Sequence, residues 1–423
     1  MVDFSQKILS HFERGKISRT EFENGAVFLH HKTPRVKGVV VSVWFLAGSR
    51  DEKKDEHGLA HLLEHMIFKG GSAIKGTELL ALMESMGAEL NAYTTKEYIC
   101  FDLSCLATDL PRIFPLFLDL IFSPSFNQDE FHKEKNVVLQ EIREDRDNHE
   151  LEAEEKVFSK SFPVDLGHPI AGSIKSVSSF TIKKLTHFYY EHFVPHKMVI
   201  SMVGDNKAEK YSELLSELFS RYKLTKKHKP TRRKMLTNIG SINHFREVMK
   251  RGGENPYLFL TCKTGPIDCD YRADFMILNH YLGEGMSSRF FKALREEEGL
   301  VYSISSYINN FSDNGSMVMG LTTKEKNLLK IEGKIKDIFA DVALHGIGEE
   351  RLLSCKRQIL SSWEMGFDDM DEINQHIGRG ELYRSHVLSF KEISKIVHEV
   401  SDERIKFVTQ SMLESGFSSL ILR

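Results

Sequence analysis

The chain has 423 residues, of which 41% are hydrophobic and 28% are charged, and its formal net charge is -3. This composition is typical of a soluble globular protein, and the nearly balanced charge argues against a general attraction to nucleic acid or to an anionic membrane. The length exceeds what one hydrophobic core usually supports, so we expect two domains of about 200 residues each.

The N-terminal text and the cysteines bear on the compartment. Charges interrupt the first 16 residues, MVDFSQKILSHFERGK, so a secretory signal is not expected. The sequence contains no run of 18 apolar residues, and we therefore predict no membrane span. The five cysteines follow neither a zinc-ribbon spacing nor a disulfide framework. Reduced thiols in a cytoplasm, that of a bacterium, fit these features best.

The chain opens with strand-like segments that lead into a helix. Residues 25–31 and 38–47 are rich in valine and aromatic residues and predict strands. In residues 55–71, DEHGLAHLLEHMIFKGG, the apolar residues recur at helical spacing. A second helix over 78–86 is predicted to end at Gly87, since glycine is the usual residue at a helix C-terminus.

Further strands and a long helix complete the first half. Residues 90–105 alternate, with Tyr98, Cys100 and Asp102 on one face and the intervening apolar residues on the other. Residues 128–156 contain neither glycine nor proline and predict a long helix. Because strands and helices mix without a regular βαβ order, the pattern favours an α+β fold over a doubly wound sheet.

A basic segment separates the two halves. Residues 221–234 read RYKLTKKHKPTRRK and carry almost no apolar residue, which favours a solvated linker between domains. The alternative is a basic patch for nucleic acid, but no aromatic interleaving or binding motif accompanies it. We therefore expect an N-terminal domain at 1–220, a linker at 221–240 and a C-terminal domain at 241–423.

The two halves carry a weak internal repeat. Residues 177–186, VSSFTIKKLT, resemble residues 400–409, VSDERIKFVT, at an offset of 223 residues, which is about half the chain. Each segment is followed by an apolar strand, MVISMVG in the first half and FSSLILR in the second. We therefore expect two similar domains related by duplication.

The pattern that carries chemistry is His61-Leu-Leu-Glu64-His65, the inverzincin motif. On a helix, residues four apart lie on one face, so both imidazoles can reach one zinc ion. The carboxylate of Glu64 would lie beside the metal, where it can accept a proton from the attacking water. The alternative is a pair of surface histidines, but the apolar neighbours of this helix predict partial burial, which calls for a reason to bury them.

A catalytic zinc ion takes three protein ligands, so a third must come from elsewhere. The helix predicted at 128–156 offers Glu134, Glu141 and Glu144. Glu134 and Glu141 are two helical turns apart on one face, so one can bind the metal while the other supports the site. The spacing alone does not choose between them, and most acids on such a helix are solvated.

The sequence resembles the pitrilysin-type (M16) zinc metallopeptidases, which include insulin-degrading enzymes and the mitochondrial processing peptidase. The carrying segments are GSRDEKKDEHGLAHLLEHMIFKGG and EKNVVLQEIREDRDN. The resemblance implies a single-half, processing-peptidase-like member with one zinc ion held by His61, His65 and Glu141, and with Glu134 as the supporting acid. It also implies that Asn91, Ala92, Tyr93 and Thr94 form an edge strand that binds the substrate, and two α/β sandwich domains, each a mainly antiparallel sheet covered by helices.

The second half adds its own resemblance. Residues 285–302, GMSSRFFKALREEEGLVY, resemble the family's arginine–tyrosine segment, which implies that Arg295 and Tyr302 bind the substrate carbonyl. A guanidinium and a phenol can stabilise the oxyanion of a tetrahedral intermediate. Without the resemblance, we would expect Arg295 to pair with a glutamate and Tyr302 to begin a core strand. One departure is visible at 147–149, where Asp-Asn-His replaces the family's acid followed by proline, which affects the loop beyond the helix.

The implied activity is a zinc metalloendopeptidase, a hydrolase that cleaves peptides or unfolded segments inside a closed chamber. In related enzymes two halves of this size surround that chamber, so we expect a homodimer whose partner supplies Arg295 and Tyr302 in trans. The first alternative is a non-catalytic core or scaffold subunit, although such members typically lose the zinc motif. The second is a protein that uses the basic linker to associate with nucleic acid.

The acids near the end of the long predicted helix allow two interpretations. They are Glu141, Glu144, Asp145, Asp147, Glu150, Glu152, Glu154 and Glu155. A solvated helix end is the simpler interpretation, and a negative wall that attracts basic peptides is the other.

Overall fold

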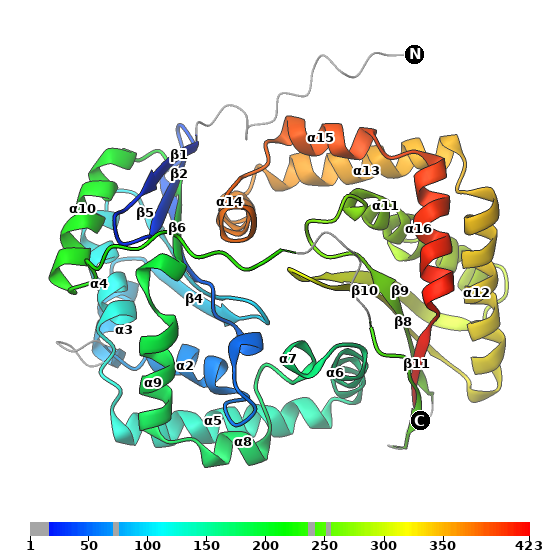
Figure 1. Cartoon of the computed structure of the whole chain (residues 1–423), viewed down its shortest axis with the longest axis horizontal. Coiled ribbons are helices and arrows are strands. Elements are labelled where there is room, and N and C mark those ends of the chain that lie inside the picture. Colours follow the sequence, from blue (N-terminus) through cyan, green and yellow to red (C-terminus); the bar gives the residue numbers. More distant parts are fainter. Residues whose placement is uncertain (1–16, 71–75, 236–241, 251–254) are drawn as a thin grey trace. The chain divides into compact units, whose positions relative to one another are not determined.

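The structure is a computed structural model that describes residues 17–70, 76–235, 242–250 and 255–423 (Figure 1). The N-terminal segment discussed above and the end of the expected linker, 236–240, lie outside the described residues. The chain forms two compact units. The first comprises residues 1–143, 168–233 and 364–390, and the second comprises 144–167, 234–363 and 391–423. Each unit therefore differs from the contiguous domains expected from sequence by one segment that comes from the other half.

The sheet of the first unit has six strands in the order β1-β2-β6-β3-β5-β4. They are β1 (Ile17–Glu21), β2 (Val27–Lys32), β6 (Met198–Gly204), β3 (Gly38–Phe45), β5 (Ile99–Leu106) and β4 (Glu89–Thr94). All neighbours are antiparallel except β2 and β6, which run parallel. Among the described strands β4 pairs with β5 alone, so β4 forms one edge of the sheet.

The sheet of the second unit has five strands in the order β7-β11-β8-β10-β9. They are β7 (Arg246–Met249), β11 (Ser418–Leu422), β8 (Tyr257–Thr264), β10 (Gly315–Thr323) and β9 (Val301–Asn310). Only β7 and β11 are parallel. Apart from β1, the first sheet has the same order and the same directions, with β2, β3, β4, β5 and β6 in place of β7, β8, β9, β10 and β11. This shared topology confirms two similar α+β domains related by duplication.

Helices cover both sheets. The first half of the chain contributes α2 (Leu59–Ile67), α3 (Gly76–Ser85), α4 (Leu110–Phe122), α5 (Gln128–Asp147), α6 (His149–Ser161), α7 (Val164–Gly167), α8 (Ile174–Ser179), α9 (Ile182–His192) and α10 (Ala208–Arg221). The second half contributes α11 (Arg272–Gly283), the π-helical turn η4 (Phe291–Glu296), α12 (Leu328–His345), α13 (Glu349–Gly366), α14 (Met370–Arg384), α15 (Phe390–His398) and α16 (Asp402–Ser415). Short 3₁₀ turns occur at Ser49–Asp51, Pro195–Lys197 and Glu325–Asn327. None of the helices in the described ranges is long and apolar enough to cross a membrane.

The two faces of the first sheet have different partners. Alternate residues such as Val41, Val43 and Phe101 belong to a large hydrophobic core that includes residues of α2, α4, α9 and α10. The intervening residues lie on the other face, where Trp44 is covered by α14. The approach is close, because a Cβ on Gly378 of α14 would lie 2.4 Å from the indole of Trp44. The alternation predicted over 90–105 therefore separates the core face from the face under α14.

The two halves of the chain exchange one helix each. Helix α14 comes from the second half but packs on β6, β3 and β2 of the first sheet. Helix α6 comes from the first half but packs on β8 and β11 of the second sheet, where Ala153 and Val157 join Phe259 in a core. Each sheet is therefore completed by a helix from the other half of the sequence.

The long helix predicted over 128–156 is two helices. Asn148 interrupts it between α5 and α6, with φ -85° and ψ 99°, and its side chain accepts hydrogen bonds from the backbone N–H groups of Glu150 and Leu151. Asparagine favours the N-cap position because its short side chain replaces the missing helical acceptors. The departure from the family text at 147–149 therefore coincides with the start of α6.

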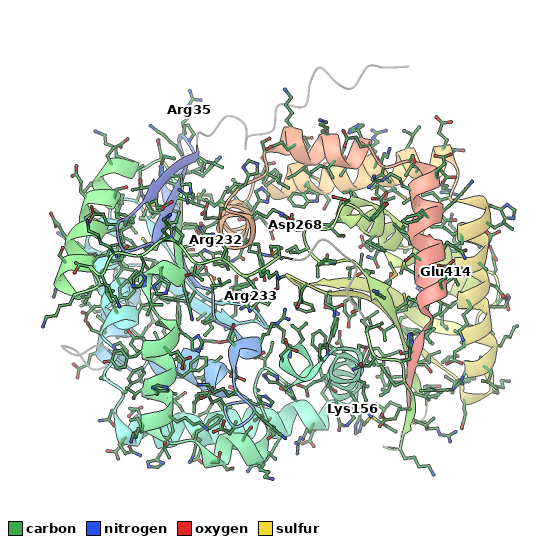
Figure 2. The ribbon with its side chains drawn as sticks, in the orientation of Figure 1. Arg35, Lys156, Arg232, Arg233, Asp268 and Glu414 are labelled. Atoms are coloured by element: carbon green, nitrogen blue, oxygen red, sulfur yellow. The ribbon has the colours of Figure 1, made fainter. Side chains whose placement is uncertain are left out.

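The end of the basic segment after α10 is anchored to the first unit. Arg233, which Figure 2 labels, forms an ion pair with Asp51 at 2.6 Å and donates to the backbone oxygen of Glu97 at 3.1 Å. Arg232 donates to the buried carboxylate of Glu381 on α14. These two arginines are thus held by carboxylates, and this part of the segment is not the solvated linker that its composition predicts.

Candidate metal centre

Helix α2 presents the histidine motif from a buried apolar base. Leu59, Leu62, Leu63 and Met66 lie in the core, which fixes the helix on the sheet. The side chains of His61, Glu64 and His65 occupy the remaining stripe, where they are half-buried. The rings of His61 and His65 lie 4.7 Å apart, as expected for residues four apart on a helix.

Helix α5 brings the third acid to this stripe. One ligand atom each of His61, His65 and Glu141 lies within 4.8 Å of the others. Nε2 of His65 lies 3.7 Å from Oε2 of Glu141. The structure therefore brings together the three residues that the sequence and the resemblance selected.

Glu134 lies beside this group as the supporting acid was expected to lie. Its Oε2 is 3.3 Å from Nδ1 of His65, and its Oε1 is 2.9 Å from Nζ of Lys69. Burial raises the pKa of Glu134, but the hydrogen bonds from His65 and Lys69 outweigh burial and lower it. The carboxylate stays ionised and can orient the ring of His65 through its second nitrogen.

His61 and His65 have different electrostatic environments. Burial and the neighbouring His65 lower the pKa of His61 to about 4, which keeps its imidazole neutral. Burial also lowers the pKa of His65, but the hydrogen bond to Glu134 and the charge of Glu141 outweigh it and raise the pKa. Nδ1 of His61 is buried and has no hydrogen-bond partner among the described residues. A buried nitrogen without a partner is costly, and a metal ion is one group that can satisfy it.

These residues fit a zinc ion. Two imidazoles and one carboxylate are the donor set of a catalytic zinc site, which keeps a further position open. Among the described residues, this cluster is the one group of histidine, cysteine and acidic side chains that could hold a metal ion.

Glu64 connects the motif to the edge strand. Its Oε2 accepts a hydrogen bond of 2.6 Å from Oγ1 of Thr94 on β4. Burial raises the pKa of Glu64, although the bond from Thr94 partly opposes it. A carboxylate with a raised pKa beside a metal site is suited to accept a proton and to return it.

The predicted substrate strand is β4, in which Asn91 is exposed and Ala92, Tyr93 and Thr94 are half-buried. Tyr93 donates a hydrogen bond of 2.7 Å from its hydroxyl to Oε1 of Gln375 on α14. An exposed sheet edge offers unpaired backbone groups to an extended peptide. The strand is thus fixed at Thr94 by the motif helix and at Tyr93 by a helix from the other half of the chain.

Arg295 and Tyr302 belong to the second unit. Cζ of Arg295 lies 4.6 Å from the ring centre of Phe291 and 5.7 Å from that of Tyr302. Tyr302 is the second residue of β9 and is 81% exposed, so its side chain does not enter a core. Within the described residues no carboxylate lies at ion-pair distance from Arg295. The alternative considered for this pair from sequence is therefore wrong, and the guanidinium rests on aromatic rings instead.

Two residues near these groups were not selected from sequence. Lys69 follows His65 by four residues, and Phe291 precedes Arg295 by four, so helical spacing is the signal that could have indicated both. Their roles depend on contacts with Glu134 and Arg295 that a single sequence does not reveal.

The family models match along most of the chain. Residues 27–173 match the model of insulinase (peptidase family M16), and residues 179–359 match that of the peptidase M16 inactive domain. The first match contains α2 and α5, and the second contains Arg295 and Tyr302.

The chain is similar along its length to bacterial proteins of comparable size. The uncharacterized zinc protease YmxG of Bacillus subtilis (strain 168) is 28% identical over 413 residues, which is 96% of this chain and 98% of that protein. The uncharacterized zinc protease ML0855 of Mycobacterium leprae (strain TN) is 28% identical over 411 residues, 96% of this chain and 91% of that protein.

Solved structures share the fold at low identity. A protease from Helicobacter pylori superposes with a TM-score of 0.85 and 19% identity, covering 97% of this chain and 99% of that one. A peptidase M16 inactive domain from Pseudomonas fluorescens gives a TM-score of 0.84 and 19% identity, covering 96% and 97%. These structures show the shared fold. The two matched models, which together cover most of the chain, show that it belongs to peptidase family M16.

Proposed function

We propose that the chain is a zinc-dependent endopeptidase that hydrolyses peptides or unfolded protein segments. The observation that carries the proposal is the meeting of His61, His65 and Glu141 within 4.8 Å, with Glu64 beside them on the same helix. Family membership supports a peptidase in general, and the intact set of ionisable residues supports an active one.

His61, His65 and Glu141 would hold one zinc ion per chain, and Glu134 would orient His65. A zinc ion bound there supplies Lewis-acid polarisation of a peptide carbonyl and of water. The neutral state of His61 favours this role, because an imidazole must be unprotonated to bind a metal.

Glu64 is proposed as the general base. Its carboxylate would accept a proton from the attacking water and return it to the leaving amine, and its raised pKa favours both transfers. The bond from Thr94 holds the carboxylate toward β4, the strand on which an extended substrate would add by backbone hydrogen bonds. The proposal thus places the base and the bound peptide at adjoining positions.

Arg295 and Tyr302 are proposed to stabilise the developing oxyanion. Their exposure and their mutual contact support this role, since neither is consumed by an ion pair within the described residues. We further propose a homodimer that encloses a chamber, in which the partner subunit supplies this pair in trans. A mixture of Glu64→Gln and Arg295→Ala subunits should then regain activity after subunit exchange, and a mixture no more active than its components would contradict trans completion.

The rival function is a non-catalytic core or scaffold subunit, which the match to an inactive-domain model keeps open. The intact motif residues favour catalysis. We also propose that the protein acts in a bacterial cytoplasm without binding nucleic acid or a membrane. Retention on DNA or RNA at physiological salt would contradict the last point.

The deciding experiment compares cleavage of a mixed quenched-peptide library by the purified chain and by its Glu64→Gln variant, with zinc content measured in both. The proposal expects activity only in the unchanged chain and one zinc ion in each. Equal activity in both would mean another site or a contaminant. Zinc in both with no cleavage by either would favour the scaffold function.

A further inference from the structure

A buried carboxylate lies at the N-terminus of the motif helix. The side chain of Glu52 has no exposed surface. Its Oε2 accepts a hydrogen bond of 2.9 Å from the backbone N–H of Gly58, and its Oε1 accepts one of 2.7 Å from that of Ala60. Gly58 occupies the N-cap position of α2 and offers no side chain to cap it. Glu52, six residues before Gly58, therefore satisfies the backbone N–H groups that the side chain of an N-cap residue would otherwise accept from.

A histidine from a distant segment completes this arrangement. Nε2 of His168, which is almost fully buried, lies 3.1 Å from Oε2 of Glu52. The ring of His168 stacks on that of His57 at 3.7 Å between centres, with 5° between the planes. The backbone oxygen of His168 also accepts a hydrogen bond from Nζ of Lys96, in the turn between β4 and β5. His168 thus joins the start of α2 to the turn that follows the edge strand.

Backbone contact fixes the same junction. Gly58 has φ +101°, and a Cβ there would lie 2.5 Å from the backbone oxygen of Ala171. Gly172 has φ +77°, and a Cβ there would lie 2.2 Å from the backbone oxygen of His57. Both glycines adopt a conformation that other residues rarely take, and both permit an approach that any side chain would block. The backbone at the start of α2 therefore packs directly against the backbone of residues 168–172.

We propose that Glu52 and His168 are positioning residues for the metal centre: they fix the N-terminal turn of α2 and thereby the place of His61. Ala60, which donates to Glu52, is the residue directly before His61. Burial raises the pKa of Glu52, and the hydrogen bonds from His168, Ala60 and Gly58 oppose this effect. The carboxyl group lies at the positive end of the helix dipole, which favours its ionised form. A metal site needs its ligands held closely, and groups that act through the ligands typically change metal affinity.

The cost of this arrangement argues for a role beyond general stability. A buried carboxylate is expensive to desolvate, and it is retained only where several hydrogen bonds compensate. An apolar residue at position 52 would avoid that cost, but it could not accept the hydrogen bonds from Gly58 and Ala60, and position 58 has no room for a capping side chain. Glu52 instead accepts hydrogen bonds from the backbone of Gly58 and Ala60, just before His61. His168 contacts both Glu52 and Lys96, and Lys96 lies in the turn between β4 and β5.

The test is the metal affinity of purified full-length variants, measured with zinc alone by competition with a chromophoric chelator. Glu52→Gln keeps the shape of the side chain but loses its charge and one acceptor, and it should weaken zinc binding about 10- to 100-fold. Cobalt(II) loaded in place of zinc should show an altered visible spectrum. His168→Gln, which keeps a donor, should give a smaller loss, and the double variant should lose less than the sum because both act through one bond.

Glu381→Gln is the matched control. Glu381 is also a buried carboxylate of the first unit, bound by Arg19 at 3.1 Å and by Arg232, but it lies on α14 and does not touch α2. It should lower the melting temperature and leave zinc affinity and the cobalt spectrum unchanged. If Glu52→Gln and His168→Gln behave like this control, the two residues are structural and the inference is wrong.

This inference rests on the proposed zinc site, and the two can fail separately. An unchanged chain that binds no stoichiometric zinc would overturn the proposed function. An unchanged chain that binds zinc as tightly as Glu52→Gln and His168→Gln would overturn the positioning role alone. If Glu52→Gln does not fold, His168→Gln decides the question by the same two measurements.

Discussion

The two halves of the chain share one topology and differ in the chemistry they place on it. In the first half α2 follows β3 and contacts β4, and in the second half α11 follows β8 and contacts β9. Helix α2 reaches its strand through the carboxylate of Glu64, which accepts from Thr94. Helix α11 reaches its strand through the amide of Asn279, whose oxygen accepts a 2.7 Å hydrogen bond from Ser306. A charged group thus stands in one half where a neutral group stands in the other.

A histidine on each of these two helices extends the comparison to a second neighbouring helix. In the first half His65 meets two carboxylates of α5, and Glu141 is one of them. In the second half Nδ1 of His280 on α11 lies 2.8 Å from the carboxylate of Glu284, but its Nε2 meets an amide, that of Gln358 on α13, at 2.9 Å from Oε1. Amides can accept a hydrogen bond but are poor zinc ligands compared with carboxylates. Among the described residues, a candidate metal centre therefore occurs in the first copy alone, because fold alone does not supply the ligands.

The largest expected effect comes from removing a ligand and so making the first half resemble the second. His65→Gln should abolish stoichiometric zinc binding and lower kcat/KM at least about 1,000-fold, because two ligands do not hold a catalytic zinc ion. Zinc content by atomic absorption and peptide cleavage check this together. A variant that keeps both would place the metal elsewhere.

Glu134→Gln tests the next step of the comparison, since it gives His65 an amide neighbour like that of His280. It should weaken zinc binding about 10- to 100-fold, because the carboxylate that orients Nδ1 of His65 is lost. Because Glu134 is buried, the melting temperature should also fall, and the loss of zinc affinity is the result that a purely structural role would not give. Glu144→Gln, three residues beyond Glu141, is the exposed control and should leave affinity unchanged.

Gly378→Ala tests how tightly α14 must lie on the first sheet. A methyl group there would lie 2.4 Å from the indole of Trp44, so the variant should lose about 1–3 kcal/mol of stability. Gly333→Ala on α12 is the control, because a Cβ at that position meets nothing within 4 Å. It should stabilise the protein by about 0.5–1 kcal/mol through helix propensity. Urea unfolding followed by circular dichroism measures both, and equal shifts would mean that α14 is loosely packed.

The first sheet should also be the more acid-sensitive, because of a buried histidine on β2. Burial and the neighbouring His31 lower the pKa of His30 to about 4, below its ordinary value near 6.5. Below pH 6.5 His30 binds a proton in the unfolded chain but stays neutral in the folded chain. The free energy of unfolding therefore falls as the pH drops from about 6.5 to about 4. His30→Leu should reduce this slope by at most about 1.4 kcal/mol per pH unit. Parallel pH profiles for both proteins, from urea unfolding, would contradict the assignment.

Local patterns predicted much of the first half. The apolar spacing of α2, the stop at Gly87 and the alternation of β5 follow from a few neighbouring residues, and the structure confirms them. The paired histidines needed no more than helical geometry. The third ligand could not be chosen from helical geometry alone, because Glu134 and Glu141 share one face of α5. Only the packing of α5 against α2 shows that Glu134 meets Nδ1 of His65 and Glu141 meets Nε2.

The features that sequence did not predict depend on contacts between distant segments. Asn148 divides α5 from α6 although no glycine or proline stands there. Arg233 leaves a segment of solvated composition to bind Asp51, about 180 residues upstream. His168 reaches Glu52 across 116 residues. A periodic pattern carries no information about such pairs, because each partner alone resembles an ordinary surface residue.

The exchange of α6 and α14 has a consequence for any attempt to divide this protein. A cut in the basic segment after α10 would leave the first fragment without the helix that covers Trp44, and the second without the one that supplies Ala153 and Val157. Each fragment would expose the apolar face that its missing helix protects. The two fragments would therefore be expected to associate, because each carries the helix that covers the sheet of the other. Because both copies lie in one polypeptide, each sheet meets its covering helix at a high effective concentration.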